Sequence, residues 1–411
     1  MAGRYRAPGF SSGEILLPAP HVDMAKWAVI ACDQFTSQPE YWAEAERIVG
    51  DAPSALRLTL PEIYLSESEA RVQAIRASMR EYLDARHLAT GVSDGFVLVE
   101  RATDAGNRLG LVGLIDLDEY DSTAGAKTLV RPTEGTIPER VPPRARIRAG
   151  APMELPHVMM LIDDPAQTVI EALYAERDAL SKRYDFELML GGGHLAGWAV
   201  EGDAAGRAAD ALSALHAKSR GLLYAVGDGN HSLAAAKHCW TEIKRALPAG
   251  EAANHPARWA LVELVNIHCP ALVFEPIHRI VKGVDAQALA RAYETYLQSR
   301  GIQPRTGADV RMIAAGVERG YGFDRHPLAD LQQFLDSYVA AHPNAEIDYI
   351  HGEADLRALA GASGAGFLLR SIDKSELFPF IADQGVLPRK AFSMGEARDK
   401  RYYLEARMLA D

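Results

Sequence analysis

The decisive stretch of this chain is residues 222–232, which read Leu222-Leu223-Tyr224-Ala225-Val226-Gly227-Asp228-Gly229-Asn230-His231-Ser232. An apolar run typical of a buried strand leads into a Gly-Asp-Gly turn, and the alanine-rich segment from Leu233 onward predicts a helix. The first backbone N–H groups of a helix have no partner within it, and the helix dipole is positive at this end. Because glycines let a ligand approach the backbone closely, the stretch predicts an anion site of the kind that binds phosphate.

Two well-known phosphate-binding loops do not fit this stretch. Gly227-x-Gly229-x-x-Ser232 has a serine where the Rossmann fingerprint requires glycine or alanine, and no strand ending in an acidic residue follows about 20 residues later. The Walker loop is excluded because no Gly-Lys-Ser/Thr triplet occurs here. A purely structural alternative remains, in which Asp228 and Asn230 cap the helix and His231 packs beside it.

Composition narrows the class of protein. The chain has 411 residues, 48% of them hydrophobic, and a formal net charge of −11. Its length allows two domains or one elaborated domain. The acidic balance argues against general nucleic-acid binding, which requires clustered Lys and Arg. The start of the sequence lacks the apolar run of a signal peptide, and no apolar stretch approaches the about 20 residues of a membrane span, so we expect a cytoplasmic protein without membrane association.

The three cysteines, Cys32, Cys239 and Cys269, are far apart in the sequence. They therefore indicate neither a disulfide framework nor a structural zinc site.

Helices and strands alternate along the chain without an internal repeat. We therefore predict an α/β fold with a mixed sheet, in which residues 1–284 form the main α/β domain and residues 285–411 form a smaller α+β region with a basic final segment.

A long arginine-rich segment is the second candidate for function. Residues 118–156 resemble a loop and are too long for an idle connection in a compact domain. The segment contains Arg131, Glu134, Thr136 and Arg140, and further arginines follow at positions 144, 146 and 148. The guanidinium group suits phosphate, and Glu134 could hold a metal ion or accept a proton. For the last three arginines, the alternative is a solvated basic loop that pairs with surface acids.

Two further residues are candidates for contact with a substrate. Asp33 ends a short apolar strand, at the edge where α/β proteins usually bind ligands, although it could equally cap a turn. His278 follows another apolar segment and either approaches the site or is a structural residue. No His-Glu-x-x-His pair or close Cys/His group occurs, which argues against a dedicated zinc site.

Several of these segments resemble a known family. Gly227–Ser232 is similar to the Ala-Asp-Gly-His-His-Arg segment of the bacterial domain-of-unknown-function 1015 family. The Arg131–Arg140 segment, Glu275-Pro276-Ile277-His278-Arg279 and Leu387-Pro388-Arg389-Lys390 appear in the matching order, and the similarity spans roughly residues 15–400. The motif in turn resembles that of the ParB, sulfiredoxin and free serine kinase superfamily, which implies a ParB/sulfiredoxin-like core that binds the phosphates of ATP, ADP or CTP at a helix N-terminus.

The sequence departs from that motif at two positions. Asn230 replaces the first His, and Ser232 replaces the Arg that would contact phosphate. Either Arg131 or Arg140 supplies the missing positive charge, or nucleotide binding is lost.

Together these features predict an enzyme of phosphoryl transfer, kinase-like or nucleotide-hydrolysing, that uses Mg²⁺ with ATP or ADP. The acceptor is expected to be a small hydroxylated metabolite, and the resemblance implies serine or phosphoserine. Asp228 and Glu134 are the expected metal ligands, and Asp228, His231 and Glu134 the expected catalytic residues. The residues expected to bind phosphate or nucleotide are Gly227, Gly229, Asn230, Ser232, Arg131, Thr136 and Arg140; Asp33 and His278 are expected to contact the substrate. The alternative is a nucleotide-binding switch or adaptor without turnover.

Overall fold

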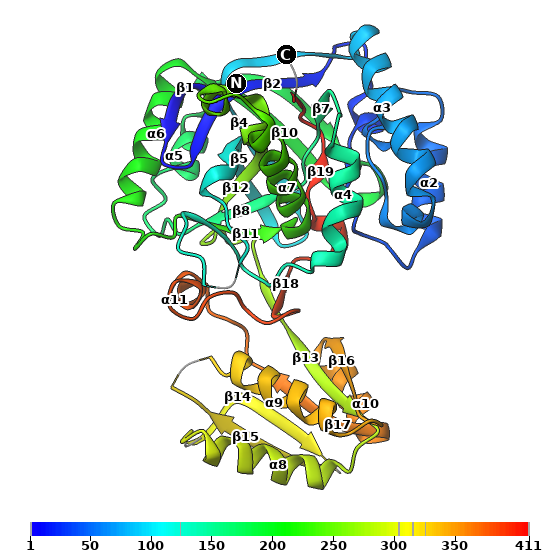
Figure 1. The fold of residues 1–411 in the computed structure, drawn as a ribbon, viewed down its shortest axis with the longest axis vertical. Coiled ribbons are helices and arrows are strands. Elements are labelled where there is room, and N and C mark those ends of the chain that lie inside the picture. Colours follow the sequence, from blue (N-terminus) through cyan, green and yellow to red (C-terminus); the bar gives the residue numbers. More distant parts are fainter. Residues whose placement is uncertain (1, 124, 303–304, 315, 325, 410–411) are drawn as a thin grey trace. The chain divides into compact units, whose positions relative to one another are not determined.

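The computed structural model describes residues 2–123, 125–302, 305–314, 316–324 and 326–409 (Figure 1). The chain forms two compact units: Met1–Val273 together with Gly395–Asp411, and Phe274–Met394. This division differs from the expected domains 1–284 and 285–411. The second unit begins earlier because β13 (Phe274–Lys282) pairs with strands of its sheet.

The final segment returns to the first unit because buried arginines bind its backbone. Arg101 donates to the carbonyls of Arg398 and Lys400, each at 2.6 Å, and Arg108 donates to the carbonyl of Asp399 at 2.6 Å. Both arginines are almost fully buried on neighbouring strands of the main sheet. A buried guanidinium must be paired, so these bonds tie the end of the chain to the first unit.

A large mixed sheet forms the centre of the first unit. In sheet order its strands are β6 (Val130–Pro132), β11 (Tyr224–Asp228), β8 (Met159–Ile162), β12 (Trp259–Asn266), β5 (Gly106–Asp116), β2 (Phe10–Pro18), β4 (Leu88–Thr103), β10 (His194–Glu201) and β9 (Ser181–Glu187), with β1 (Ala2–Ala7) paired to β2. β11 runs parallel to β6 and antiparallel to β8, whereas β8 runs parallel to β12. The predicted α/β class with a mixed sheet is therefore confirmed.

Helices and short strands surround this sheet. The α-helices are α1 (Met24–Trp27), α2 (Pro39–Val49), α3 (Ser68–Asp84), α4 (Val141–Arg148), α5 (Ile170–Ala175), α6 (Gly202–His216) and α7 (Asn230–Ala246). The 3₁₀ helices are η1 (Ala55–Arg57), η2 (Glu62–Glu67), η3 (Leu117–Glu119), η4 (Pro138–Arg140), η5 (Arg177–Ala179), η6 (Met189–Gly191), η7 (Glu251–Asn254), η8 (Pro256–Arg258) and η9 (Ala397–Asp399). Two short strand pairs complete the unit: β3 (Val29–Ile30) with β19 (Tyr402–Tyr403), and β7 (Met153–Glu154) with β20 (Arg407–Met408).

The sheet separates two apolar cores. Along β5, Leu111 and Ile115 join the core that includes Trp240 of α7, whereas Val112 and Leu114 join the core that includes Trp27 of α1. Successive side chains of a strand point to opposite faces, so a continuous apolar run serves both cores.

One sequence expectation about this unit is wrong. The segment 118–156 is not a continuous loop, because it contains β6, η4, α4 and β7. α4 begins with proline in its first turn, where the missing N–H has no intrahelical partner to lose. Its sequence has few apolar residues, and Ala145 packs against Ala235 and Cys239 of α7. Tertiary packing therefore stabilises a helix that apolar periodicity did not indicate.

The second unit is a separate α+β body. Its sheet has the order β15 (Val317–Gly322), β14 (Arg305–Ala314), β17 (Gly364–Leu369), β13 and β16 (Glu346–His351), with β18 (Phe392–Met394) paired to β13. Its helices are α8 (Ala286–Ser299), α9 (Leu328–Ala341), α10 (Glu353–Ser363) and α11 (Lys374–Gln384). Among the helices that the structure describes in either unit, none combines the length and apolar character needed to cross a lipid bilayer.

Candidate functional site

The Gly-Asp-Gly stretch forms the predicted junction between a strand and a helix. β11 ends at Asp228, and α7 begins at Asn230. Between them Gly229 has φ = 82°, in the left-handed region, and a Cβ on this residue would lie 3.0 Å from Val158 Cα. Both the backbone angle and the close approach favour glycine. The turn therefore brings a carboxylate directly to the start of a long helix.

Polar atoms at this turn lack protein partners. Asp228 Oδ1 accepts the Gly229 N–H at 3.0 Å, but Asp228 Oδ2 is buried without a hydrogen bond from any described residue, and so is Asn230 Oδ1. Lys400 Nζ lies 4.0 Å from Asp228 Oδ2. Within the described chain no side chain caps α7. The capping alternative is therefore not what the structure shows, and the first turn of α7 keeps donors and acceptors for a ligand.

His231 is held in one tautomer beside this turn. The backbone N–H of Ile137 donates to His231 Nε2 at 3.2 Å, so Nε2 is the unprotonated nitrogen and Nδ1 carries the proton. Burial, together with the charges of Arg144 and Arg140, lowers the pKa of His231 to about 4, and the charge of Asp33 opposes this shift. His231 is therefore neutral near pH 7, a hydrogen-bond donor through Nδ1 and a weak base.

A second set of polar groups connects Asp33 to the same helix. Asp33 Oδ2 lies 3.7 Å from His157 Nε2, and His157 Nε2 lies 3.4 Å from Ser232 Oγ on the first turn of α7. The hydroxyl of Tyr403 lies 2.7 Å from His157 Nδ1. Burial alone would raise the pKa of Asp33, but the charge and hydrogen bond of His157, with Gln34 and Arg144, hold it below its ordinary value. Asp33 is thus ionised near pH 7.

Sequence reasoning did not single out His157, Tyr403 or Lys400. His157 lies two residues before the buried strand β8, and Lys400 and Tyr403 belong to a basic and aromatic final segment. The pairing of β19 with β3, in which Tyr403 is opposite Val29, brings this segment beside Asp33. A polar residue at the border of an apolar strand is the only local signal that could have indicated His157.

Arg131 is directed away from the turn. It is buried, and its guanidinium donates to the backbone carbonyls of Thr128 at 3.1 Å, Ala126 at 3.4 Å and Gly221 at 3.2 Å. Gly221 lies before the first residue of β11, whereas the Gly-Asp-Gly turn lies at the other end of this strand. The structure therefore does not bring the Arg131 side chain to Asp228, because three carbonyls at the other end of the strand bind it.

The rest of the Arg131–Arg140 segment runs past the turn. β6 pairs in parallel with β11, and Thr133 donates to the carbonyl of Val226 through its N–H at 3.2 Å and its hydroxyl at 2.8 Å. The half-buried residues Glu134 and Thr136 follow on the side of the turn. Arg140 is exposed at the end of η4, close enough to His231 to lower its pKa.

His278 belongs to the second unit. It is buried in β13, and its Nδ1 accepts the backbone N–H of Leu369 at 3.2 Å. Burial lowers its pKa to about 4, so the ring is neutral near pH 7. The contacts of His278 in this unit are those of a structural residue within the sheet.

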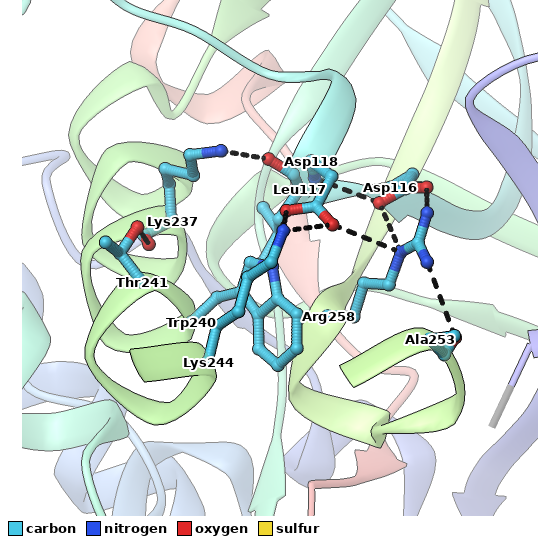
Figure 2. A network of polar contacts seen from close by, with 9 residues as sticks. All are labelled: Asp116, Leu117, Asp118, Lys237, Trp240, Thr241, Lys244, Ala253 and Arg258. Atoms are coloured by element: carbon cyan, nitrogen blue, oxygen red, sulfur yellow. Dashed lines mark hydrogen bonds and ion pairs between the residues drawn. The ribbon is translucent and has the colours of Figure 1, made fainter. Parts of the chain in front are cut away.

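A polar network fixes α7 along its length (Figure 2). Lys237 Nζ donates to the carbonyl of Leu117 at 2.7 Å, and Trp240 Nε1 donates to Asp118 Oδ1 at 2.8 Å. Lys244 contacts both oxygens of Asp118 at 2.9 Å, and Arg258 binds the neighbouring Asp116 with two nitrogens. The bonds of Lys237, Trp240 and Lys244 hold one side of α7 to η3, directly after β5.

The chain is similar to proteins of one family and to several solved structures. The family model "Protein of unknown function (DUF1015)" matches residues 16–339, and among curated proteins none matches the chain. A mutant free serine kinase in complex with ADP is 10% identical with a TM-score of 0.39, and the match covers 71% of this chain and 91% of the kinase. A conserved hypothetical protein from Pyrococcus furiosus is 11% identical, with a TM-score of 0.36 and coverage of 71% and 93%. SbnI from Staphylococcus aureus, with a C-terminal truncation, is 12% identical, with a TM-score of 0.34 and coverage of 69% and 82%. These structural similarities are remote and assign no function to this chain.

Proposed function

The chain belongs to the DUF1015 family, whose description assigns no activity, and from its own site we propose that it is a phosphoryl-transfer enzyme, kinase-like or nucleotide-hydrolysing. One observation carries the proposal. The uncapped first turn of α7 adjoins a carboxylate whose Oδ2 is buried without a hydrogen bond from the described residues, and Lys400 Nζ lies 4.0 Å away. Such an arrangement suits a phosphate that arrives with a cation.

The phosphate would be held mainly by backbone groups. The N–H groups of Asn230 and His231 would face the anion, because those of Ser232 and Leu233 already donate to the carbonyl of Gly229. Gly229 permits the left-handed turn that precedes these N–H groups, and the Nδ1–H of His231 adds one donor. Lys400 and Arg140 are the proposed cations, in place of the arginine that the motif lacks at Ser232.

Mg²⁺ is proposed to bind only together with the phosphates. Among the described residues no group of three or more His, Cys, Asp or Glu side chains could hold a metal ion. Mg²⁺ is commonly bound by one or two carboxylates together with substrate phosphates, so the unpartnered Oδ2 of Asp228 fits such an ion. Glu134 is the proposed second carboxylate. The ion would neutralise the phosphate oxygens that Asp228 would otherwise repel.

The acceptor hydroxyl is proposed to lie between this turn and Asp33. Its oxygen would form a bond to the terminal phosphorus of ATP or ADP, while the bond from that phosphorus to the bridging oxygen breaks and its electron pair leaves with the nucleotide. The hydroxyl proton would pass to Asp33. A loose transition state needs little basicity, so an ionised Asp33 acts chiefly by orienting the hydroxyl. His231 Nε2 already accepts the N–H of Ile137 and Nδ1 carries the proton, so we propose His231 as a donor and not as the proton acceptor.

A thermal-shift series tests the nucleotide site. ADP and ATP, each with and without Mg²⁺, should raise the melting temperature, because a ligand that binds only the native state stabilises it. Samples that bind are then incubated with small hydroxylated metabolites, serine and phosphoserine first, and followed by ³¹P NMR. A new phosphoester or free phosphate supports the enzyme, whereas binding without product supports the nucleotide-binding switch. Failure of every nucleotide to shift the melting temperature would overturn both.

A further inference from the structure

A cavity of about 120 Å³ lies in the first unit beside the amino-terminal half of α7. Its wall is mostly apolar and comes from distant segments. The main contributors are Leu58 and Leu60 after η1, Met79 of α3, Ile147 of α4, Met153 of β7 and Leu233 of α7. Small-molecule sites are typically concave and mostly apolar with a few placed polar groups, so this space is a candidate ligand site.

Polar groups of the cavity wall are gathered at the first turn of α7. Ser232, His157 and Tyr403 all line the cavity, and His157 contacts the other two, with 3.4 Å between Ser232 Oγ and His157 Nε2 and 2.7 Å between His157 Nδ1 and the Tyr403 hydroxyl. Asp33 lies 3.7 Å from the same His157. Ser232 thus belongs both to the cavity and to the proposed phosphate site.

The other charged groups of the wall are already paired. Arg148 forms an ion pair with Glu154, and Arg144 forms one with Glu62. Thr59 donates its hydroxyl to the carbonyl of Ala55 at 3.0 Å. A second charged group of a ligand would find no free partner among these residues, whereas a hydrocarbon would gain contacts with the apolar wall.

From this arrangement we infer that the acceptor is an alcohol with a compact apolar body, which occupies the cavity while the hydroxyl lies at His157 and Ser232. The inference rests on the proposed function for the direction of the hydroxyl. A cavity of roughly 150 Å³ lined by apolar side chains holds benzene, so this one takes a body of about that size or a short branched chain. Free serine, with its ammonium and carboxylate groups, does not match the apolar wall.

Methionine NMR tests the inference directly, since Met79 and Met153 line the cavity and Met312 lies in the second unit. Benzyl alcohol and phenyl phosphate are added to the full chain with ¹³C-labelled methionine methyl groups. Both should shift the Met79 and Met153 signals and leave Met312 unchanged. Serine at the same concentration should shift none of the three. Unchanged Met79 and Met153 signals with both aromatic probes would overturn the inference.

Two substitutions at one position provide matched variants. Ile147→Trp fills the cavity and should weaken benzyl alcohol binding by about tenfold or more, whereas Ile147→Ala enlarges it and should retain binding. If the Ile147→Trp variant folds poorly, Leu60→Phe replaces it, because this substitution fills the space from another wall and should weaken binding in the same way. ADP affinity, measured on the same samples, should remain that of the parent. If the folded, cavity-filled variants bind benzyl alcohol as tightly as the parent does, the inference is overturned, even when ADP binds. If the parent does not bind ADP, that result counts against the proposed function instead.

Discussion

Lys400 Nζ lies 4.0 Å from Asp228 Oδ2, although the two residues come from distant parts of the sequence. The contact exists because Arg101 binds the carbonyl of Lys400 at 2.6 Å and thereby holds the final segment against the main sheet. An incoming phosphate would be attracted by the charge of Lys400 and repelled by that of Asp228. Loss of the lysine should therefore weaken phosphate binding, whereas loss of the carboxylate charge should not.

Asp228→Asn should separate metal binding from phosphate binding. The substitution keeps the size of the side chain and removes the charge, so Mg²⁺ should no longer add to the thermal stabilisation by ADP or ATP. Binding without Mg²⁺ should persist, because the repulsion between carboxylate and phosphate is gone. The measurement is the melting temperature with each nucleotide, with and without Mg²⁺. An unchanged effect of Mg²⁺ in a folded variant would contradict the role of Asp228.

Lys400→Met should weaken nucleotide binding. A charged hydrogen bond contributes about 1.5–3 kcal/mol, which corresponds to roughly ten- to a hundred-fold in affinity. The control is Lys182→Met, since Lys182 is on β9 at the opposite edge of the sheet from β6 and β11 and is half exposed. Isothermal titration with ADP compares the two variants. Equal affinities would show that Lys400 serves only to pair with Asp228.

Arg131→Ala should lower stability and leave nucleotide affinity nearly unchanged. Its guanidinium is bound by three backbone carbonyls, so its loss should reduce the free energy of unfolding by roughly 1.5–3 kcal/mol. Arg140→Ala should show the reverse, because Arg140 is exposed near His231. Urea unfolding and ADP titration of both variants check this pair. A normal stability for Arg131→Ala together with lost binding would restore Arg131 to the phosphate site.

His231 should remain neutral to about pH 5, with its proton on Nδ1. Its pKa in the folded chain is about 4, below the ordinary value of about 6.5 in the unfolded chain. Between these values the unfolded state binds more protons, so stability falls as the pH falls from about 6.5 to 4 and does not change through this group above that range. Imidazole ¹⁵N NMR identifies the tautomer and its titration. Protonation of His231 near pH 6.5 would contradict the assignment.

Asp118→Ala should loosen α7. The variant removes the acceptor of Trp240 and the partner of Lys244 (Figure 2). Burial alone would raise the pKa of Asp118, but its bonds to Lys244 and Trp240 hold it below the ordinary value, so its contribution is present above about pH 4 and is lost on acidification. We expect a lower melting temperature and altered tryptophan fluorescence, neither of which should occur in the exposed control Asp51→Ala.

Local chemistry accounts for what could be predicted from the sequence. The apolar run before Gly227 predicted β11, and the alanine-rich segment after it predicted α7, both of which are present. These features depend on side-chain period and on a glycine with positive φ, which act within a few residues. For the same reason the mixed α/β class and the family could be inferred from motifs and their order.

The environment of the site was decided by tertiary structure. Asp33, His157 and Tyr403 meet only because β19 pairs with β3, and Arg131 turns away from Asp228 because unpaired carbonyls lie at the other end of β11. An arginine side chain has five N–H donors and binds acceptors that the rest of the folded chain leaves unpaired. No local sequence pattern predicts where those acceptors lie. The sequence by itself therefore determined the Gly-Asp-Gly turn between β11 and α7. Only the packed structure determined which charged groups surround it, because those contacts join segments whose separation along the chain carries no periodic signal.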